Sequence, residues 1–309
     1  MIPVLTLEAV EPLLDWLALS DALLDGHRNA PPQIEDVLLS RQDDRLLSRS
    51  AWIDGMGLGV KSVSVFPGNA AQGRPSVQGA MLVFDDRTGA IEAVIDNALI
   101  TKWKTAADSL LGTRLLARPD AANLLIVGAG TVVGTLIEAY RAWKPGIAIT
   151  LWARRTEAAE ALAARYPGVG VARDLQAAVA GADIVSTCTM AKAPVVQGAW
   201  LRPGQHLDLI GAYTPEMREV DDAALGRGRI FVDSRATTLP HIGELMIPLA
   251  NGTITEADIL GDLRDFAAGR VAPRGPGDIT IFKNGGGAHL DLMTARYIME
   301  RWHASRPQS

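Results

Sequence analysis

The chain of 309 residues is poor in cysteine and has no long apolar run. Cys188 is its single cysteine, so no intrachain disulfide can form, which is typical of proteins kept in a reducing compartment. No stretch of about 18 apolar residues, the length needed to cross a membrane, is present. The N-terminus lacks the charged and apolar segments of a secretory signal. We therefore expect a cytoplasmic protein that makes no membrane contact.

Charge of one sign is not concentrated anywhere in the chain. The 30 basic and 35 acidic residues give a net charge of −5, spread along the sequence, so neither nucleic-acid binding nor a disordered acidic tail is expected. The histidines His206, His241 and His289 lack the spacing of metal ligands, and we expect no metal. Apolar residues make up 48% of the chain, which is enough for a core in each of two domains.

The hydrophobic pattern before residue 123 indicates mixed helices and antiparallel strands. The predicted helices span residues 8–29 and 98–117, and the predicted strands span residues 57–65, 79–85 and 90–96. Gly89 supplies the positive φ of a hairpin turn between the last two strands. This part of the chain is therefore expected to be α+β.

The pattern changes at residue 123, where short apolar strands begin to alternate with helices. The strands are expected in the segments LLIV (124–127), AITLWARR (148–155), ADIVSTCT (182–189), QHLDLIGAY (205–213) and RIFVDS (229–234). Alternation of this kind predicts βαβ units and a doubly wound parallel sheet of the Rossmann type. A last helix is expected at about residues 288–304.

A glycine-rich turn follows the first of these strands directly and opens a helix. This context favours binding of a dinucleotide, whose pyrophosphate would sit at the helix N-terminus. Val133 occupies the third position of the usual fingerprint and Gly134 comes one residue later, so helix and strand are expected slightly farther apart. A plain turn with chance glycines is the alternative. The expected cofactor contacts are Gly128, Ala129, Gly130, Thr131 and Val132.

The end of the next strand indicates which dinucleotide is bound. NAD enzymes usually carry an acid there, but this chain has Trp152, Arg154, Arg155 and Thr156. Two arginines and a threonine suit a 2′-phosphate, which favours NADPH, with NADH possible. A solvated basic corner is the alternative.

Two later strand ends carry further cofactor candidates. Thr187, Cys188 and Thr189 follow one strand, where the hydroxyl groups either line the nicotinamide side or satisfy the strand end. Gly211, Tyr213 and Thr214 follow another, at the carboxyl edge where ligands bind in such sheets. Thr105, in the helix before the glycine turn, completes the set.

Several motifs resemble, in order, those of the ornithine cyclodeaminase/mu-crystallin family. They are GLGVKSVSVFPGN, RPSVQGAMLVFDDRTGAIEAVID, LITKWKTAADS, LLIVGAG, GAYTPEMRE and DITIFKNGGGAHLDL, and the resemblance runs from about residue 46 to the end. It implies a homodimer, with a substrate-binding and dimerisation domain formed by residues 1–118 and 288–309. A Rossmann domain, residues 119–287, is inserted between these parts. It also implies chemistry at C2 of an L-amino acid or cyclic imino acid, with a nicotinamide cofactor.

The resemblance assigns roles to residues outside the Rossmann segment. Lys61 matches a lysine that meets the substrate, although a strand lysine is otherwise often solvated. Lys104 replaces the arginine that usually grips the substrate carboxylate, keeping the charge but losing the bidentate fork. Arg49 is either a replacement carboxylate ligand or a surface arginine on an edge strand. Asp291 lies near the active site in the family, although helix capping would also explain it.

We predict catalytic roles for Lys61, Lys104 and Asp291, and substrate contacts for Arg49, Lys61, Ser76, Lys104 and Gly286.

Tyr213 stands where cyclodeaminases of this family carry an aspartate. A base that drives ring closure must accept a proton near neutral pH, and tyrosine, with a reference pKa of about 10, does this poorly. The GAYTP form resembles the family's reductases of cyclic imines. The sequence therefore predicts NADPH-dependent reduction of Δ1-pyrroline-2-carboxylate to L-proline or of Δ1-piperideine-2-carboxylate to L-pipecolate. Alternatives are an ornithine cyclodeaminase, an alanine- or opine-type dehydrogenase, and a mu-crystallin-like binding protein for NADPH and a small ligand.

Overall fold

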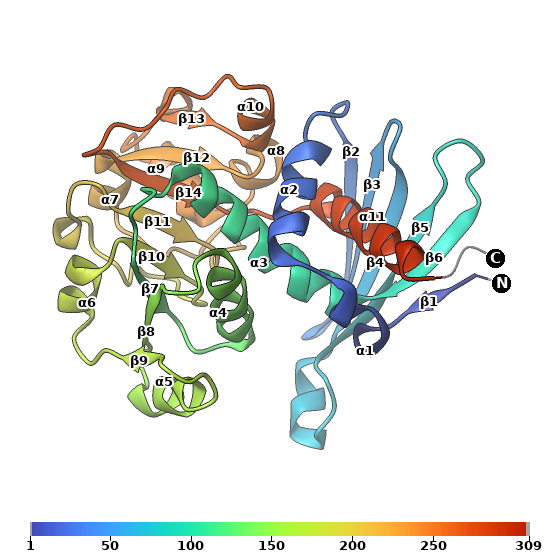
Figure 1. Cartoon of the computed structure of the whole chain (residues 1–309), viewed down its shortest axis with the longest axis horizontal. Coiled ribbons are helices and arrows are strands. Elements are labelled where there is room, and N and C mark those ends of the chain that lie inside the picture. Colours follow the sequence, from blue (N-terminus) through green and yellow to red (C-terminus); the bar gives the residue numbers. More distant parts are fainter. Residues whose placement is uncertain (1, 307–309) are drawn as a thin grey trace. The chain divides into compact units, whose positions relative to one another are not determined.

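The structure is a computed structural model of the chain and describes residues 2–306. The chain divides into two compact units. Unit 1 comprises residues up to Ala107 together with those from Gly287 onward, and unit 2 comprises Asp108–Gly286 (Figure 1). The division falls inside helix α3 (Asn97–Leu116), earlier than the boundary expected at residue 118. The last turns of α3 belong to unit 2, where the Thr113 hydroxyl lies 2.6 Å from the hydroxyl of Tyr140.

Unit 1 is built on a six-stranded sheet of order β1-β6-β5-β4-β3-β2. The strands are β1 (Val4–Leu5), β2 (Gln33–Arg41), β3 (Asp44–Ile53), β4 (Gly57–Val65), β5 (Val77–Phe84) and β6 (Ile91–Asp96). Strands β2 to β6 form an antiparallel meander, and β1 pairs parallel to β6. Helix α11 (Ala288–Ala304) packs on β3 and β4 and against α2 (Trp16–Gly26) (Figure 1).

Most of the elements expected in unit 1 are confirmed, but two segments differ. The expected helix over 8–29 is wrong: it consists of α1 (Leu7–Val10), a 3₁₀ turn (Glu11–Leu13) and α2. Pro12 lacks a backbone N–H and interrupts the helix, and the Asp15 carboxylate then caps α2 by accepting from the Ala18 N–H at 2.8 Å. Strands β2 and β3 were not expected. The hairpin turn is confirmed, with Gly89 at φ +67°.

Unit 2 contains an eight-stranded parallel sheet of order β13-β12-β14-β11-β10-β7-β8-β9. Its strands are β7 (Asn123–Val127), β8 (Ala148–Trp152), β9 (Gly170–Val171), β10 (Ile184–Thr187), β11 (His206–Leu209), β12 (Gly228–Val232), β13 (Ile259–Gly261) and β14 (Ile279–Lys283). Its helices are α4 (Thr131–Trp143), α5 (Thr156–Ala163), α6 (Leu175–Gly181), α7 (Asp222–Arg227), α8 (Arg235–Thr238), α9 (Gly243–Ala250) and α10 (Leu263–Ala267), with 3₁₀ turns at Gly198–Trp200 and Glu256–Asp258.

Both faces of the sheet in unit 2 are buried, which confirms the doubly wound arrangement. Leu125, Val185 and Leu207 pack with Val179 of α6 and Leu225 of α7 in one core cluster. Because side chains alternate along a strand, the neighbouring positions point to the other face, where Asp208 of β11 meets Tyr140 of α4. The chain reverses its direction across the sheet at β7, which lies between β8 and β10. Ligands of such sheets bind at this switch point.

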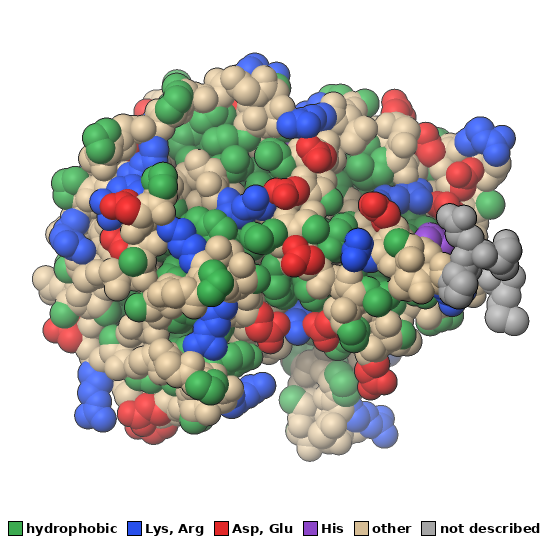
Figure 2. All heavy atoms as spheres, in the orientation of Figure 1, with side chains coloured by type: hydrophobic (Ala, Val, Ile, Leu, Met, Phe, Trp, Pro, Cys, Tyr) green, Lys and Arg blue, Asp and Glu red, His purple; other side chains and the backbone are tan. Residues whose placement is uncertain are grey.

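Among residues 2–306, no helix combines the length and the apolar character that a membrane span requires. On the face drawn in Figure 2, basic and acidic side chains are interspersed, and no large patch of one sign is visible.

Candidate active site

The glycine turn of unit 2 is a tight turn that leads into helix α4. Gly128 has φ +147°, and a Cβ there would lie 2.9 Å from both the carbonyl oxygen and the Sγ of Cys188. Its N–H donates to the Trp152 carbonyl at 2.8 Å, which ties the turn to the end of β8. Gly130 is the N-cap of α4 and no side chain caps the helix. Gly130 and Thr131 are exposed, so the helix N-terminus offers open N–H groups to an anion.

Gly134, the last glycine of the turn, faces Tyr166 and not the neighbouring strand. A Cβ at Gly134 would lie 2.4 Å from the hydroxyl oxygen of Tyr166, which follows α5. The close approach at this position is therefore to Tyr166, while Val133 is fully buried in the core.

The end of β8 forms a basic corner without an acid. Trp152 is half-buried, and Arg154 and Arg155 are exposed at the start of α5. Neither arginine forms an ion pair within residues 2–306. Thr156 occupies the first position of α5, and Glu157 lies one residue further on, exposed. The corner can therefore offer two guanidinium groups and a hydroxyl to an anionic ligand.

The segment after β10 lies beside the glycine turn, with Cys188 and Thr189 half-buried. The Cys188 N–H donates to the Val127 carbonyl at 2.9 Å. The Thr187 hydroxyl is buried and has no hydrogen-bond partner in the described part of the chain. Burial raises the pKa of the Cys188 thiol well above its usual value, and the negative charges of Glu219 and Asp208 raise it further. A thiol whose pKa is raised in this way is a poor nucleophile.

The segment after β11 places Tyr213 at the surface. Its side chain is 58% exposed, so it is not a packed core aromatic. The backbone around it is ordered by hydrogen bonds, since the Thr214 carbonyl accepts from the N–H groups of Met217 and Gly243 at 3.2 and 3.0 Å. Gly211 donates its N–H to a carboxylate oxygen of Glu219 at 2.6 Å.

Unit 1 contains a buried ion pair at the centre of its sheet. Lys61 lies on β4, between β3 and β5, with 7% of its surface exposed, which excludes the solvated alternative. Its Nζ donates to Oδ1 of Asp291 at 2.8 Å and lies 2.8 Å from Oδ2. Asp291 is in the first turn of α11 and fully buried. The structure therefore brings together two residues that are 230 positions apart.

Two further cations lie near this pair. Arg49 on β3 is directly opposite Lys61 in the strand register, and its guanidinium binds the Asp36 carboxylate of β2 at 2.8 and 2.9 Å. Because β3 is flanked by β2 and β4, the structure excludes the alternative of an arginine on an edge strand. Lys104, half-buried on α3, forms no ion pair within the described residues.

The cluster shifts the protonation equilibria of its members. Burial lowers the pKa of Lys61, and the charges of Lys104 and Arg49 lower it further, whereas Asp291 opposes the shift. Burial alone would raise the pKa of Asp291, but the charges of Lys61 and Lys104 outweigh it and the pKa is lowered overall. Burial lowers the pKa of the neighbouring His289 to about 3, so its imidazole is neutral at pH 7. The site thus holds an excess of positive charge that an anionic substrate would balance.

Three expected site residues lie outside these contacts. Ser76 precedes β5 and is half-buried, with its carbonyl accepting from the Phe66 N–H. Thr105 follows Lys104 on α3. Gly286, in unit 2, has φ +70° and donates its N–H to Asp233 at 2.5 Å.

Asp36 was not among the expected residues. Only the pairing of β2 with β3 shows that it faces Arg49. Glu219 was also missed, although it ends the segment GAYTPEMRE that the sequence had singled out.

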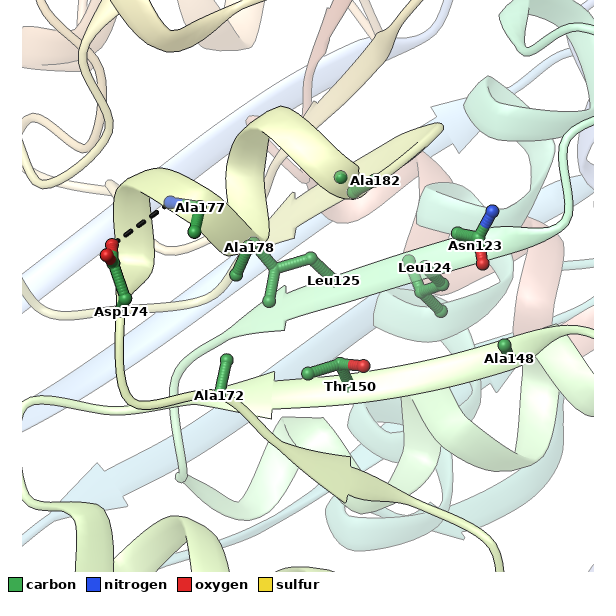
Figure 3. A pocket seen from close by; sticks show the side chains of 11 residues that line it. Asn123, Leu124, Leu125, Ala148, Thr150, Ala172, Asp174, Ala177, Ala178 and Ala182 are labelled. Atoms are coloured by element: carbon green, nitrogen blue, oxygen red, sulfur yellow. Dashed lines mark hydrogen bonds between the residues drawn. The ribbon is translucent and has the colours of Figure 1, made fainter.

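A separate cavity of about 390 Å³ lies on the sheet of unit 2. Figure 3 shows it between β7, β8 and α6, with Asn123 and Ala148 at one end and Asp174 at the other. Alanine supplies five of its eleven lining residues, and the Asp174 carboxylate accepts a hydrogen bond from the Ala177 N–H at 3.0 Å. Neither Gly128 nor Arg155 lines it, so it is distinct from the glycine turn.

The parallel sheet, the glycine turn and the open helix N-terminus define a protein with a Rossmann-type unit. The model of the ornithine cyclodeaminase/mu-crystallin family matches residues 24–306, and the chain belongs to this family.

Similar proteins include enzymes of imino and amino acid metabolism. The Δ1-pyrroline-2-carboxylate reductase of Paracoccus denitrificans is 54% identical over 291 residues, covering 92% of both chains. The structure of the Thermococcus litoralis Δ1-pyrroline-2-carboxylate reductase with NADH and L-proline is similar over the full length of both chains, with TM-score 0.88 and 25% identity. An archaeal alanine dehydrogenase dimer with bound NAD has TM-score 0.88 and 26% identity, covering 100% of this chain and 98% of its own.

Proposed function

We propose that the chain is a reductase of cyclic imino acids that uses NAD(P)H and prefers NADPH. It converts Δ1-pyrroline-2-carboxylate to L-proline, Δ1-piperideine-2-carboxylate to L-pipecolate, or both. The observation that carries the proposal is the buried Lys61–Asp291 pair with the positive charge of Lys104 beside it. The 54% identity to a Δ1-pyrroline-2-carboxylate reductase supports the same substrate class.

Lys104 is the proposed ligand of the substrate carboxylate. Its ammonium has no ion pair among the described residues, whereas the guanidinium of Arg49 is already bound to Asp36. Arg49 therefore contributes charge to the site and makes the weaker candidate for a direct contact. A lysine binds a carboxylate as a point charge, which leaves the orientation of the ring to other contacts.

Lys61 is the proposed proton donor to the ring nitrogen. Reduction of an imine to an amine adds one hydride at C2 and one proton at nitrogen. Bound reduced nicotinamide supplies the hydride. Burial lowers the pKa of Lys61, which makes its ammonium a better acid than that of an ordinary lysine. Asp291 holds the ammonium in place at 2.8 Å and keeps it charged in a buried site.

The residues of unit 2 fit a dinucleotide. The turn from Gly128 to Val132 would hold the pyrophosphate on the N-terminus of α4. Arg154, Arg155 and Thr156 would bind the 2′-phosphate, which supports NADPH over NADH. Thr187 at the end of β10, with Thr189 and Tyr213 on the loops after β10 and β11, would line the nicotinamide.

We further propose a cytoplasmic homodimer. The alanine dehydrogenase of similar structure is a dimer, which supports this assembly. The single cysteine is consistent with a reducing compartment.

The test is to follow NADPH oxidation with each cyclic imine at neutral pH, with Lys61→Met as the inactive control. Ornithine, and pyruvate with ammonia, are assayed in parallel. Turnover of a cyclic imine by the wild type and its loss in Lys61→Met support the proposal. Oxidation that requires pyruvate and ammonia would indicate an alanine-type dehydrogenase, and ammonia release from ornithine a cyclodeaminase. Tight NADPH binding without any turnover would indicate a binding protein.

A further inference from the structure

Glu219 is a buried carboxylate that the proposed reaction does not use. It is the last residue of the segment GAYTPEMRE, and none of its surface is exposed. Its Oε1 accepts from the N–H and the hydroxyl of Thr189 at 2.7 and 2.8 Å. Its Oε2 accepts from the N–H of Gly211 at 2.6 Å. One side chain therefore binds the second residue of each of two loops, those after β10 and β11.

The two loops are in close contact around this carboxylate. A Cβ at Gly211 would lie 2.0 Å from the Thr189 carbonyl oxygen and 2.5 Å from Oε1 of Glu219, so no larger residue fits there. The Arg218 N–H donates to the Ala191 carbonyl at 3.0 Å. At the surface, Lys192 and Glu216 form a further link at 3.5 Å, but both side chains are largely exposed. Of these links, the Glu219 carboxylate provides the three charge-assisted hydrogen bonds, all of them part-buried.

The backbone of Glu219 is itself held by hydrogen bonds. Its N–H and that of Val220 donate to the carboxylate of Glu244 at 2.7 and 3.0 Å, and its carbonyl accepts from Val195 and Val196. Glu244 lies on α9 and is fully buried. Burial raises the pKa of Glu244 to about 7, and the charge of Glu219 adds to the effect. The backbone of Glu219 is thus held by Glu244 on α9 and by the far end of the loop after β10.

We propose that Glu219 is a positioning residue for the nicotinamide end of the cofactor. It acts through Thr189 and Gly211, which hold the backbone that leads to Tyr213. The inference rests on the proposed function only in assigning the nicotinamide to these two loops. Loops that are already ordered lose less conformational freedom when the cofactor binds, and small displacements of a reacting group reduce the rate of its chemistry strongly.

The test compares Glu219→Gln with two control variants, using NADPH as the probe. Asp183→Asn removes a comparable carboxylate at the amino end of β10, where it accepts from the N–H groups of Ala122 and Asn123 at 2.9 and 3.0 Å. Lys192→Ala removes the exposed link between the same loops. The measurements are the Kd of NADPH by fluorescence, kcat and KM with the cyclic imine, and the thermal midpoint.

We expect Glu219→Gln to remain folded and to lower kcat/KM by about tenfold or more, with a weaker Kd for NADPH. Asp183→Asn should lower the thermal midpoint without changing the Kd of NADPH. Lys192→Ala should change neither the thermal midpoint nor the Kd. If Glu219→Gln does not fold, Glu219→Asp, which keeps the charge but is one methylene shorter, takes its place with the same expectation. An unchanged Kd and kcat in the folded variant, or equal losses in Asp183→Asn, would overturn the inference. A wild type that binds NADPH but reduces no imine would refute the proposed function instead, and the comparison of Kd values would still stand.

Discussion

Replacement of Asp291 by asparagine should destabilise unit 1 strongly. The side chains of Lys61 and Asp291 are only 9% and 1% exposed, so solvent screens the pair very little. The substitution leaves the Lys61 ammonium buried without its counter-ion. Removing one partner of such a pair costs about 3 kcal/mol or more.

The assay is urea unfolding followed by tryptophan fluorescence, in which the stacked Trp16 and Trp103 report on unit 1, with ring centroids 3.8 Å apart. Lys61→Met, and Lys61→Met combined with Asp291→Asn, complete a double-mutant cycle. The free energy of unfolding of the double variant should fall by less than the sum of the two single decreases, with a difference of at least about 1.5 kcal/mol, because no unpaired charge remains.

The pH dependence gives an independent check of the same reasoning. Without Asp291 the pKa of Lys61 falls further, because Asp291 is the group that raises it. Between that lowered pKa and 10.5, the unfolded chain binds more protons than the folded chain, so stability rises with pH. The difference in free energy of unfolding between the wild type and Asp291→Asn should therefore shrink as the pH is raised from about 7 to about 9. A decrease in the free energy of unfolding of Asp291→Asn below about 1 kcal/mol, or a difference from the wild type that grows with pH, would refute the reasoning.

Three further predictions concern the cofactor, the substrate and acid stability. Replacing Arg154 and Arg155 together by alanine should raise the Kd of NADPH by about tenfold or more. The Kd of NADH should stay within about twofold of the wild-type value, as measured by fluorescence titration. Equal losses for both cofactors would show that these residues do not bind the 2′-phosphate. Lys104→Ala should raise the KM for the imine by about tenfold, and Lys104→Arg should restore it. A KM that stays constant would remove Lys104 from the carboxylate site. Burial lowers the pKa of His206 and of His289 to about 3, so between about pH 3 and pH 6.5 both stay largely neutral in the folded chain while the unfolded chain binds protons. Stability should therefore fall as pH drops, by about 2 kcal/mol per histidine at pH 5, and His289→Gln should reduce the loss seen by urea unfolding.

The regular elements were predictable where burial is periodic. Strand β4 alternates between more and less buried residues, and its bounds agree with the expected 57–65. Strand β2 has almost no buried residue, so its sequence carries no alternation that could mark it. The break at Pro12 was visible in the sequence, but the helical spacing of the leucines after it, Leu13, Leu14, Leu17 and Leu24, concealed it.

The candidate site was predictable only in part, because its contacts depend on tertiary structure. Lys61 and Asp291 were grouped by family resemblance, since no local pattern links residues 230 positions apart. The binding of Arg49 to Asp36 follows from the register of two strands that were not expected. By contrast, the glycine turn is a local feature, and both Gly128 and the N-terminus of α4 have the expected geometry.

Transfer of deuterium tests the central claim most directly. The wild type is incubated with Δ1-pyrroline-2-carboxylate and NADPH that carries deuterium at the transferred position of its nicotinamide, and the product is analysed by mass spectrometry and NMR. The account predicts L-proline with one deuterium at C2 for each NADPH consumed. Proline without deuterium at C2, or no turnover of either cyclic imine, would contradict it.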